Sequence, residues 1–287
     1  MHYIITALGC KVNQYETQAM EAILRSHGHR PAGEGETADC VIVNTCAVTA
    51  ESGRKSRQAL RRLEGENPGA VTVLTGCYPQ AFPEEAAKIE EADVVTGSGN
   101  RHAILQDVQK VLNGEETKVV DIRPHQRGES FEELPMDRFA DHTRAFVKVE
   151  DGCNRRCAYC VIPRARGPVR SRSVEKCMEY GKESLAFSGY HEITLLSLST
   201  SDYRGLNELC DGLMDYCESR GIGLSLPSLR ADNFSMDIMS RLQKVRKGGL
   251  TFAPEAGTQR LRDAINKNVR EEDLLHSCQV AFEGGWN

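Results

Sequence analysis

Three cysteines near the middle of the chain are spaced for iron–sulfur chemistry. Cys153, Cys157 and Cys160 form a C-x3-C-x2-C pattern that directly follows an apolar, strand-like segment. Three thiolates hold three irons of a [4Fe–4S] cluster, which leaves the fourth iron open to a different ligand. Zinc is the alternative, but Zn²⁺ usually takes four ligands in two close pairs, and no nearby Cys or His completes such a set. The spacing therefore favours a cluster over a zinc site.

The open iron in this cysteine pattern typically binds S-adenosylmethionine (SAM). The amino and carboxylate groups of SAM chelate the iron, and a low-potential cluster then donates an electron that generates a 5′-deoxyadenosyl radical. Tyr159 directly precedes the last cysteine of the triplet. We expect Tyr159 to offer its ring or its backbone to the adenine of SAM.

A second set of cysteines is defined by position rather than by close spacing. Cys10, Cys46 and Cys77 each follow a predicted strand, in turns that also contain Gly, Asn or Thr. The carboxyl ends of parallel strands meet at one edge of a sheet, and open α/β sheets place their binding sites there. Backbone N–H groups of such turns also bond to cluster sulfurs. The three residues either hold a second cluster or are small residues at strand ends.

Alternating strand-like and helix-like segments must position this second set. Over residues 3–112 the pattern predicts an α/β fold with a doubly wound parallel sheet. The expected strands are Tyr3–Leu8, Cys40–Asn44, Val71–Thr75 and Asp93–Thr96. The expected helices lie near Gln14–His27, Ala50–Leu63, Pro83–Glu91 and Arg101–Leu112.

The remainder of the chain reads as a linker followed by a second βα series. Residues 113–141 are polar and contain two prolines, which is typical of a linker with some extended structure, so the expected domains are 1–112 and 142–287. The expected strands of the second series are Ala145–Val149, Glu192–Leu198, Gly223–Leu229 and Leu250–Ala253, and its helices lie near Val174–Phe187, Leu206–Ser219, Ser235–Val245 and Glu271–Glu283. The sequence stops where a further strand would begin, so we expect an incomplete (βα) barrel.

Composition narrows the class of protein. Hydrophobic residues make up 40% of the 287 residues and charged residues 27%, which excludes a wholly disordered or membrane-dominated chain. There is no signal-peptide pattern and no apolar run of about 18 residues, so we expect a cytoplasmic protein with no membrane partner. The net charge of −5 gives no global attraction to nucleic acid, and any RNA contact must come from local basic runs. Two such runs lie at 54–62 and 155–172, and each is either a phosphate-binding surface or solvated charge.

Residues 1–172 resemble the methylthiotransferase branch of the radical-SAM enzymes. The resemblance rests on Leu8-Gly9-Cys10-Lys11-Val12-Asn13-Gln14-Tyr15-Glu16, on residues 44–48 and 75–78, and on the passage from Gly152 to Arg172. The opening G-C-K-V-N motif is similar to that of the subgroup that modifies N6-threonylcarbamoyladenosine beside the tRNA anticodon. By this resemblance, Cys10, Cys46 and Cys77 hold an auxiliary [4Fe–4S] cluster in an N-terminal cluster domain, and the later triplet holds the SAM cluster.

The resemblance also implies an activity and its partners. It implies a tRNA methylthiotransferase that adds a methylthio group to C2 of the modified adenosine, using two [4Fe–4S] clusters and SAM. The implied partners are tRNA, a reductant protein of the flavodoxin or ferredoxin type, and a sulfur donor. Ser197 and Ser199 lie at the end of the second barrel strand, where radical-SAM enzymes usually approach the SAM amino group. Arg230 and Glu255 are candidate contacts for the SAM carboxylate and ribose, respectively. All four residues have a structural alternative as turn or scaffold residues.

The resemblance changes after Arg172. Residues 173–287 look closer to another, poorly characterised radical-SAM family, and Glu255 stands where methylthiotransferases usually have Gln. Two alternatives to the tRNA methylthiotransferase therefore stay open. One is a radical-SAM enzyme with another substrate, and the other is an inactive truncated or chimeric fragment that only binds clusters.

Overall fold

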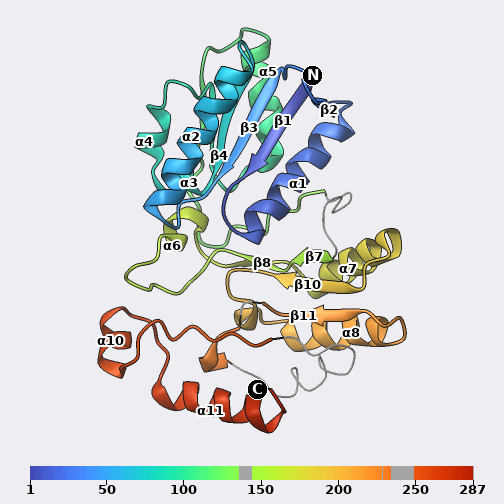
Figure 1. The fold of residues 1–287 in the computed structure, drawn as a ribbon, viewed down its shortest axis with the longest axis vertical. Coiled ribbons are helices and arrows are strands. Elements are labelled where there is room, and N and C mark those ends of the chain that lie inside the picture. The colour runs from blue at the N-terminus through green and yellow to red at the C-terminus, as the bar shows by residue number, and fades with distance from the viewer. Residues whose placement is uncertain (136–143, 228, 234–248, 287) are drawn as a thin grey trace. The chain divides into compact units, whose positions relative to one another are not determined.

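The structure is a computed structural model that describes residues 1–135, 144–227, 229–233 and 249–286. It divides into two compact units (Figure 1). Unit 1 comprises Met1–Asp137 and Val161–Pro168, and unit 2 comprises Arg138–Cys160 and Val169–Asn287. Each unit has its own sheet and its own buried core.

Unit 1 is built on a six-stranded sheet in the order β2-β1-β3-β4-β5-β6, with every neighbouring pair parallel. Its strands are β1 (His2–Ala7), β2 (Arg30–Pro31), β3 (Cys40–Thr45), β4 (Val71–Gly76), β5 (Val94–Thr96) and β6 (Val119–Asp121). The predicted doubly wound parallel sheet is confirmed. Strands β2 and β6 were not predicted, because two or three residues are too few for a periodic pattern. Strand β6 lies within the segment predicted to be a linker, so the sheet extends beyond Leu112.

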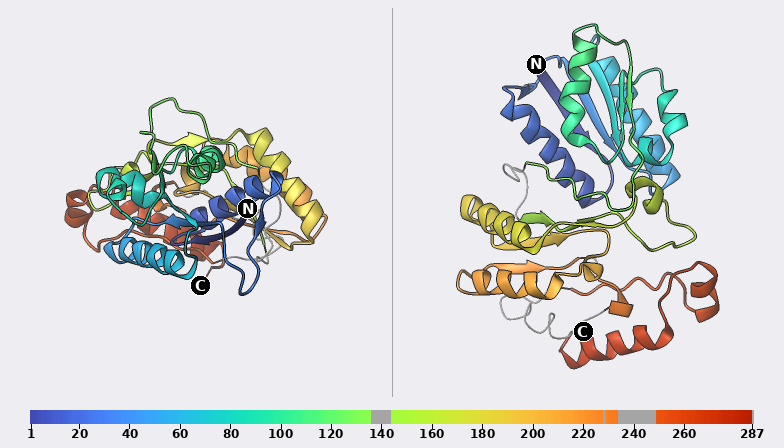
Figure 2. Two further views of the ribbon diagram at one scale, coloured as in Figure 1. Left: turned by 90° about the horizontal axis from the view of Figure 1, so that it is seen from above. Right: turned by 180° about the vertical axis from the view of Figure 1, so that it is seen from behind.

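Helices cover both faces of this sheet (Figure 2). They are α1 (Lys11–Ser26) and α5 (Ile104–Leu112) on one face, and α2 (Ala50–Glu66), α3 (Cys77–Ala81), α4 (Pro83–Ala87) and α6 (Ile162–Arg166) on the other. Strand β3 shows why two layers form: Cys40 and Ile42 pack into the core with α1 and α5, whereas Val41 and Val43 pack into the other. A strand buried on both faces needs apolar side chains in both registers.

The strand order reverses at β1, because the chain places β2 on one side of β1 and β3 on the other. Open α/β sheets bind ligands outside the carboxyl ends of the strands at such a switch point. The loops that follow β1 and β3 begin at Leu8 and Cys46. The topology therefore singles out these loops as a binding site.

Unit 2 contains a three-stranded parallel sheet in the order β11-β10-β7 and a separate antiparallel pair, β8 and β9. The strands are β7 (Ala145–Lys148), β8 (Glu150–Asp151), β9 (Arg170–Ser171), β10 (Glu192–Leu196) and β11 (Gly223–Ser225). The helices are α7 (Val174–Ser188), α8 (Leu206–Glu218), α10 (Gln259–Ala264) and α11 (Glu271–Glu283). Parallel strands joined through α7 and α8 agree with the predicted partial (βα) barrel.

Two predicted elements of unit 2 differ from the structure or fall outside it. Residues 250–253, expected as a fourth strand, form no strand, since none of the described residues pairs with them in a ladder. The helix expected at 235–245 lies outside the described residues. Among the helices that are described, none is long and apolar enough to cross a bilayer.

Four cysteines outside the two triplets are core residues. Cys177, Cys210 and Cys217 lie in the core of unit 2, and Cys40 lies in the core of unit 1. Burial raises the pKa of Cys40 to about 12 and that of Cys217 to about 11. A thiol that stays protonated is a poor metal ligand, so Cys40 and Cys217 serve as packing residues and not as candidate ligands.

Candidate iron–sulfur and cofactor sites

The sheet of unit 1 brings its three candidate cysteines to one edge. Cys10 lies in the loop after β1 and directly precedes α1, Cys46 directly follows β3, and Cys77 begins α3 directly after β4. These three strands are neighbours in the sheet. Cys10 is exposed, whereas Cys46 and Cys77 are buried.

One buried amide side chain contacts all three cysteine loops. Asn13, in the first turn of α1, donates from Nδ2 to the carbonyl oxygens of Leu8 and Thr45, at 2.8 Å in each case. Its Oδ1 lies 3.7 Å from the Sγ of Cys77. Asn13 is fully buried, so these contacts are made without competition from water. The asparagine therefore fixes the spacing of the loops.

Two glycines allow the backbone to approach this site closely. Gly9 has a φ of +103°, and a Cβ on it would lie 2.8 Å from the Sγ of Cys46. Gly76 has a φ of +97°, and a Cβ on it would lie 2.3 Å from the Oδ1 of Asn44. Each glycine directly precedes a candidate ligand, so the absence of a side chain is what makes the loop positions possible.

A buried arginine contacts the third cysteine. Arg166, the last residue of α6, donates from Nε to the Sγ of Cys77 at 3.1 Å. Burial raises the pKa of the Cys77 thiol, and the positive charge of Arg166 opposes that rise. The same guanidinium donates to Asn13 and Glu16. The sequence placed Arg166 in a basic run that is either a phosphate-binding surface or solvated charge, and its 1% exposed side chain excludes both interpretations for this residue.

Further ion pairs continue from this arginine. Glu16 pairs with Arg101 at 2.7 Å, and Arg101 pairs with Glu132 at 2.8 Å. The side chains of Glu16 and Arg101 are almost completely buried. Asn13 and Glu16 both fall inside the motif at residues 8–16 and lie three residues apart on α1. These two facts are the sequence features that could have identified them as site residues. Nothing in the sequence pointed to Arg101.

The donor set at this edge fits an iron–sulfur cluster. Three soft thiols lie on adjacent loops, and an arginine N–H bonds to one of the sulfurs. Among the described residues, no three Cys, His, Asp or Glu side chains converge tightly enough for a single metal ion. A four-iron cluster holds its ligands farther apart, because each thiolate binds a different iron.

The cysteine triplet of unit 2 lies in a loop held by hydrogen bonds to two other segments. The loop follows β8, and Val169 N–H donates to the Oδ1 of Asn154 at 3.1 Å. Ala158 N–H donates to the carbonyl of Ile265 at 2.9 Å, and Asn266 donates to the carbonyl of Arg156 at 2.7 Å. Burial raises the pKa of Cys153, and the neighbouring Cys160 and Cys157 raise it further.

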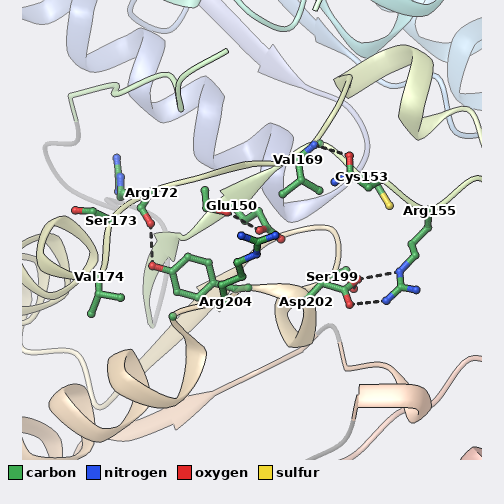
Figure 3. A pocket seen from close by; sticks show the side chains of 15 residues that line it. Glu150, Cys153, Arg155, Val169, Arg172, Ser173, Val174, Ser199, Asp202 and Arg204 are labelled. Atoms are coloured by element: carbon green, nitrogen blue, oxygen red, sulfur yellow. Dashed lines mark hydrogen bonds and ion pairs between the residues drawn. The ribbon is translucent and has the colours of Figure 1, made fainter. Parts of the chain in front are cut away.

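An ion pair joins this cysteine loop to the loop after β10 (Figure 3). Arg155 donates from Nη2 to the Oδ1 of Asp202 at 2.8 Å, and the Ser199 hydroxyl donates to Oδ2 of the same carboxylate, also at 2.8 Å. Burial of Asp202 opposes its ionisation, but the hydrogen bonds from Arg155 and Ser199 outweigh burial and hold its pKa below the usual value. Sequence reasoning missed Asp202.

A cavity of about 800 Å³ lies beside Cys153. Its wall carries many charged side chains, among them Glu150, Arg155, Arg172, Asp202 and Arg204 (Figure 3). Arg172 is buried, and its guanidinium stacks over the Tyr180 ring at 4.1 Å. So many polar groups around one space favour a polar, charged ligand.

Glu150 is a further residue of the cavity wall with a strongly shifted pKa. Burial raises the pKa of its carboxyl to about 7, although the Ser171 hydroxyl donates to its Oε1 at 2.7 Å and opposes that rise. The carboxyl therefore titrates near neutral pH, and this residue was not predicted from the sequence.

The two predicted serines occupy different environments. Ser199 lies on the cavity wall and donates to Asp202. Ser197 is buried, accepts the Ser199 N–H at 3.0 Å, and donates to the Thr200 hydroxyl at 3.2 Å. Ser199 is therefore the better placed of the two for contact with a ligand.

Tyr159, Glu255 and Arg230 also lie close to the cysteine loop. Tyr159 is 56% exposed, and partial desolvation together with the nearby carboxylate of Glu255 raises its pKa to about 12. Glu255 has a φ of +66° and pairs with Lys267 at 3.1 Å. Arg230 pairs with Asp232 at 2.8 Å. Their contacts with SAM remain predictions.

The two basic runs lie in different environments, the first exposed and the second partly buried. Four of the five basic residues of the first run pair with carboxylates, since Arg54 and Lys55 pair with Glu51, Arg61 with Glu91, and Arg62 with Glu66. In the second run, the side chains of Arg166, Arg170 and Arg172 are buried. These three are structural or site residues and not a solvent-facing phosphate surface.

Comparisons with known proteins agree with both halves of this description. Residues 2–97 match the model of Uncharacterized protein family UPF0004, and residues 147–287 match that of the Radical SAM superfamily. The chain is 32% identical over 284 residues to threonylcarbamoyladenosine tRNA methylthiotransferase MtaB of Aquifex aeolicus, covering 95% of this chain and 67% of that protein. The chain belongs to the radical-SAM methylthiotransferase family.

Other members of this methylthiotransferase family are similar over different lengths. MtaB of Bacillus subtilis is 37% identical over 196 residues, covering 68% of this chain and 43% of that protein. The tRNA-2-methylthio-N(6)-dimethylallyladenosine synthase of Pelotomaculum thermopropionicum is 35% identical over 286 residues, covering 95% of this chain and 63% of that protein. The similarity to methylthiotransferases therefore extends into residues 173–287. The chain spans 43–67% of the length of these relatives.

A solved structure confirms the fold. The radical S-adenosylmethionine methyltransferase TsrM of Kitasatospora setae matches with a TM-score of 0.70 and 13% identity, covering 99% of this chain and 66% of that chain. At this identity the match concerns the fold of this methylthiotransferase family member and not its reaction.

Proposed function

We propose that this chain is a two-cluster radical-SAM methylthiotransferase that acts on N6-threonylcarbamoyladenosine in tRNA. The observation that carries the proposal is the presence of two separate cysteine triplets, one at the edge of the unit 1 sheet and one in the loop after β8. The family membership supports the reaction class. The G-C-K-V-N motif and the names of the Aquifex and Bacillus relatives support the choice of substrate.

In unit 2, the chain's own residues would hold and orient SAM. A [4Fe–4S] cluster on Cys153, Cys157 and Cys160 supplies, when bound, the electron that cleaves SAM. The Arg155–Asp202 ion pair fixes the first part of the cysteine loop, so the thiols keep their positions in a polar cavity. The polar ends of SAM would then meet the residues proposed above as cofactor contacts, which are Tyr159, Ser197, Ser199, Arg230 and Glu255.

In unit 1, Cys10, Cys46 and Cys77 would hold an auxiliary [4Fe–4S] cluster associated with sulfur delivery. Asn13 holds the three loops at a fixed spacing, and Gly9 and Gly76 let their backbones come close. The proposed partners are tRNA as substrate, a flavodoxin- or ferredoxin-type reductant and a sulfur donor. We propose the cytoplasm as its location.

Anaerobic reconstitution tests the two roles separately. Purified chain with iron and sulfide is incubated with SAM and dithionite, and 5′-deoxyadenosine is measured together with iron content. We expect Cys157→Ala to abolish deoxyadenosine, whereas Cys77→Ala lowers the iron content but leaves deoxyadenosine formation in place. Cys278→Ser is the matched control, because Cys278 lies on α11 away from either triplet in sequence. Wild-type protein that binds a single cluster would contradict the two-cluster assignment.

Nucleoside analysis tests the substrate. A strain that lacks its own threonylcarbamoyladenosine methylthiotransferase is complemented with this chain, and its tRNA is digested and analysed by mass spectrometry. We expect the 2-methylthio derivative of threonylcarbamoyladenosine with wild type, and none with Cys77→Ala or Cys157→Ala. A methylthio derivative of another nucleoside would contradict the proposed substrate, and no methylthio product at all would contradict the activity.

A further inference from the structure

Arg166 makes an unusual set of contacts for a buried arginine. Its Nε donates to the Sγ of Cys77 at 3.1 Å, while its two terminal nitrogens donate to Glu16 and Asn13. The side chain is 1% exposed. A guanidinium has five N–H groups in a rigid plane, so one side chain can bind a sulfur, a carboxylate and an amide oxygen together.

The helix that carries Arg166 is fastened to unit 1 by its neighbouring residues. Ala165 packs in the core, and its carbonyl accepts the Ser98 hydroxyl at 2.6 Å. Arg164 donates to the carbonyl of Ala81 at 2.8 Å, at the end of α3, the helix that begins with Cys77. The arginine is therefore held from its backbone as well as from its side chain.

The carboxylate behind Arg166 is held in turn by a second cation. Glu16 lies between Arg166 and Arg101, and Arg101 also pairs with Glu132. Removing one member of a buried ion pair leaves an uncompensated charge and strongly destabilises the folded state. The position of the Arg166 guanidinium is thus determined by the fold and does not depend on a bound group.

We infer that Arg166 is a positioning residue for the auxiliary cluster. It donates an N–H to the ligand sulfur of Cys77 and so sets the reduction potential of the cluster as well as the orientation of the thiolate. Hydrogen bonds to ligand sulfurs and nearby positive charge stabilise the reduced, more negative state of a cluster and raise its potential. This inference rests on the auxiliary cluster proposed above.

The test measures the auxiliary cluster alone. In a background of Cys153→Ala, Cys157→Ala and Cys160→Ala, only the unit 1 site can bind a cluster. Iron content, electron paramagnetic resonance of the reduced form and the midpoint potential are then measured by redox titration. None of these readouts requires turnover.

Three variants separate the hydrogen bond from charge and from folding. The double variant Glu16→Gln/Arg166→Met removes opposite charges together, so no uncompensated carboxylate stays buried. Arg166→Lys keeps the charge but cannot reproduce the planar set of donors. Arg164→Met is the matched control, because Arg164 lies on the same helix turn, is exposed and bonds to a carbonyl instead of a sulfur.

We expect the double variant to have a lower midpoint potential than the parent, by on the order of tenfold in the one-electron equilibrium, or ~59 mV. The midpoint potential of Arg166→Lys should lie between those of the double variant and the parent. The midpoint potential of Arg164→Met should match that of the parent. Equal potentials in all four proteins would overturn the positioning role. If the parent itself binds no iron, the cluster assignment fails, and that result is distinguishable because no variant comparison is needed to see it.

Discussion

Glu150 is a buried carboxyl on the cavity wall beside Cys153, and its environment favours the protonated form. Burial raises its pKa to about 7 from an ordinary value of 4.5. An acid whose pKa is higher in the folded protein loses its proton first in the unfolded chain as the pH rises. The ionisation of Glu150 therefore lowers the free energy of unfolding progressively between about pH 4.5 and pH 7. Above pH 7 the whole of this destabilisation is present.

Glu150→Gln should remove this cost while keeping an oxygen for the Ser171 hydroxyl. We expect the variant to be more stable than wild type at pH 8 by up to about 3 kcal/mol, because a shift of roughly two to three pKa units corresponds to that energy. The difference should shrink toward zero near pH 4. Urea unfolding across this pH range measures it, with Asp215→Asn on the exposed face of α8 as the control. A constant difference at all pH values would show that titration of Glu150 is not its cause.

Individual residues differ in how far the sequence could place them. The spacing of Cys153, Cys157 and Cys160 is local, so it could be read directly. The role of Arg166 could not be predicted from the sequence, because it depends on contacts with Asn13 and Glu16, which lie about 150 residues earlier in the chain. A buried arginine and a solvated one look the same in sequence, and only the fold distinguishes them.

The strands of unit 1 were predicted more accurately from the sequence than those of unit 2. Strands buried on both faces form continuous apolar runs, and a Gly or Cys follows each of them within three residues, which explains the agreement over β1, β3, β4 and β5. Residues 250–253 show the limit of the same reasoning, since an apolar run becomes a strand only where a neighbour offers backbone partners.

The turn after β4 depends on Gly76. Its φ of +97° and ψ of −146° lie in a region that is essentially limited to glycine, and a Cβ would also lie 2.9 Å from the carbonyl oxygen of Thr45. Gly76→Ala should therefore destabilise the protein by roughly 2–4 kcal/mol, from backbone strain together with the clash. The free energy of unfolding from urea titration measures this effect.

Gly69→Ala is the matched comparison. Gly69 also has a positive φ of +85°, but a Cβ there would meet nothing within 4 Å. This variant should lose only about 1–2 kcal/mol from backbone strain. Equal losses in the two variants would contradict the close packing of the turn, since the clash with Asn44 and Thr45 is what separates them.

At the scale of the whole molecule, the buried cores of the two units share no residue. Leu60 packs in unit 1 and Leu213 in unit 2, and both are fully buried. The chain has one tryptophan, Trp286, which is part of the unit 2 core. Its fluorescence therefore reports on that core, while far-ultraviolet circular dichroism reports on both units.

Leu213→Ala should lower the midpoint of the tryptophan transition in urea, since removing a buried leucine costs about 2–5 kcal/mol. Leu60→Ala should lower the stability seen by circular dichroism while leaving the tryptophan midpoint in place, as expected for compact units with separate cores. A tryptophan midpoint that moves equally in both variants would show that the two cores unfold as one.

The placement of α6 has a consequence for the order of folding during synthesis. Unit 1 takes Val161–Pro168 from beyond the first stretch of unit 2, so the N-terminal sheet is made long before its last helix. Until Arg166 leaves the ribosome, Glu16 and Cys77 lack this partner. All six candidate ligand cysteines precede Arg166 in the chain. On a growing chain, the N-terminal site is therefore completed only after the thiols of both sites have been synthesised.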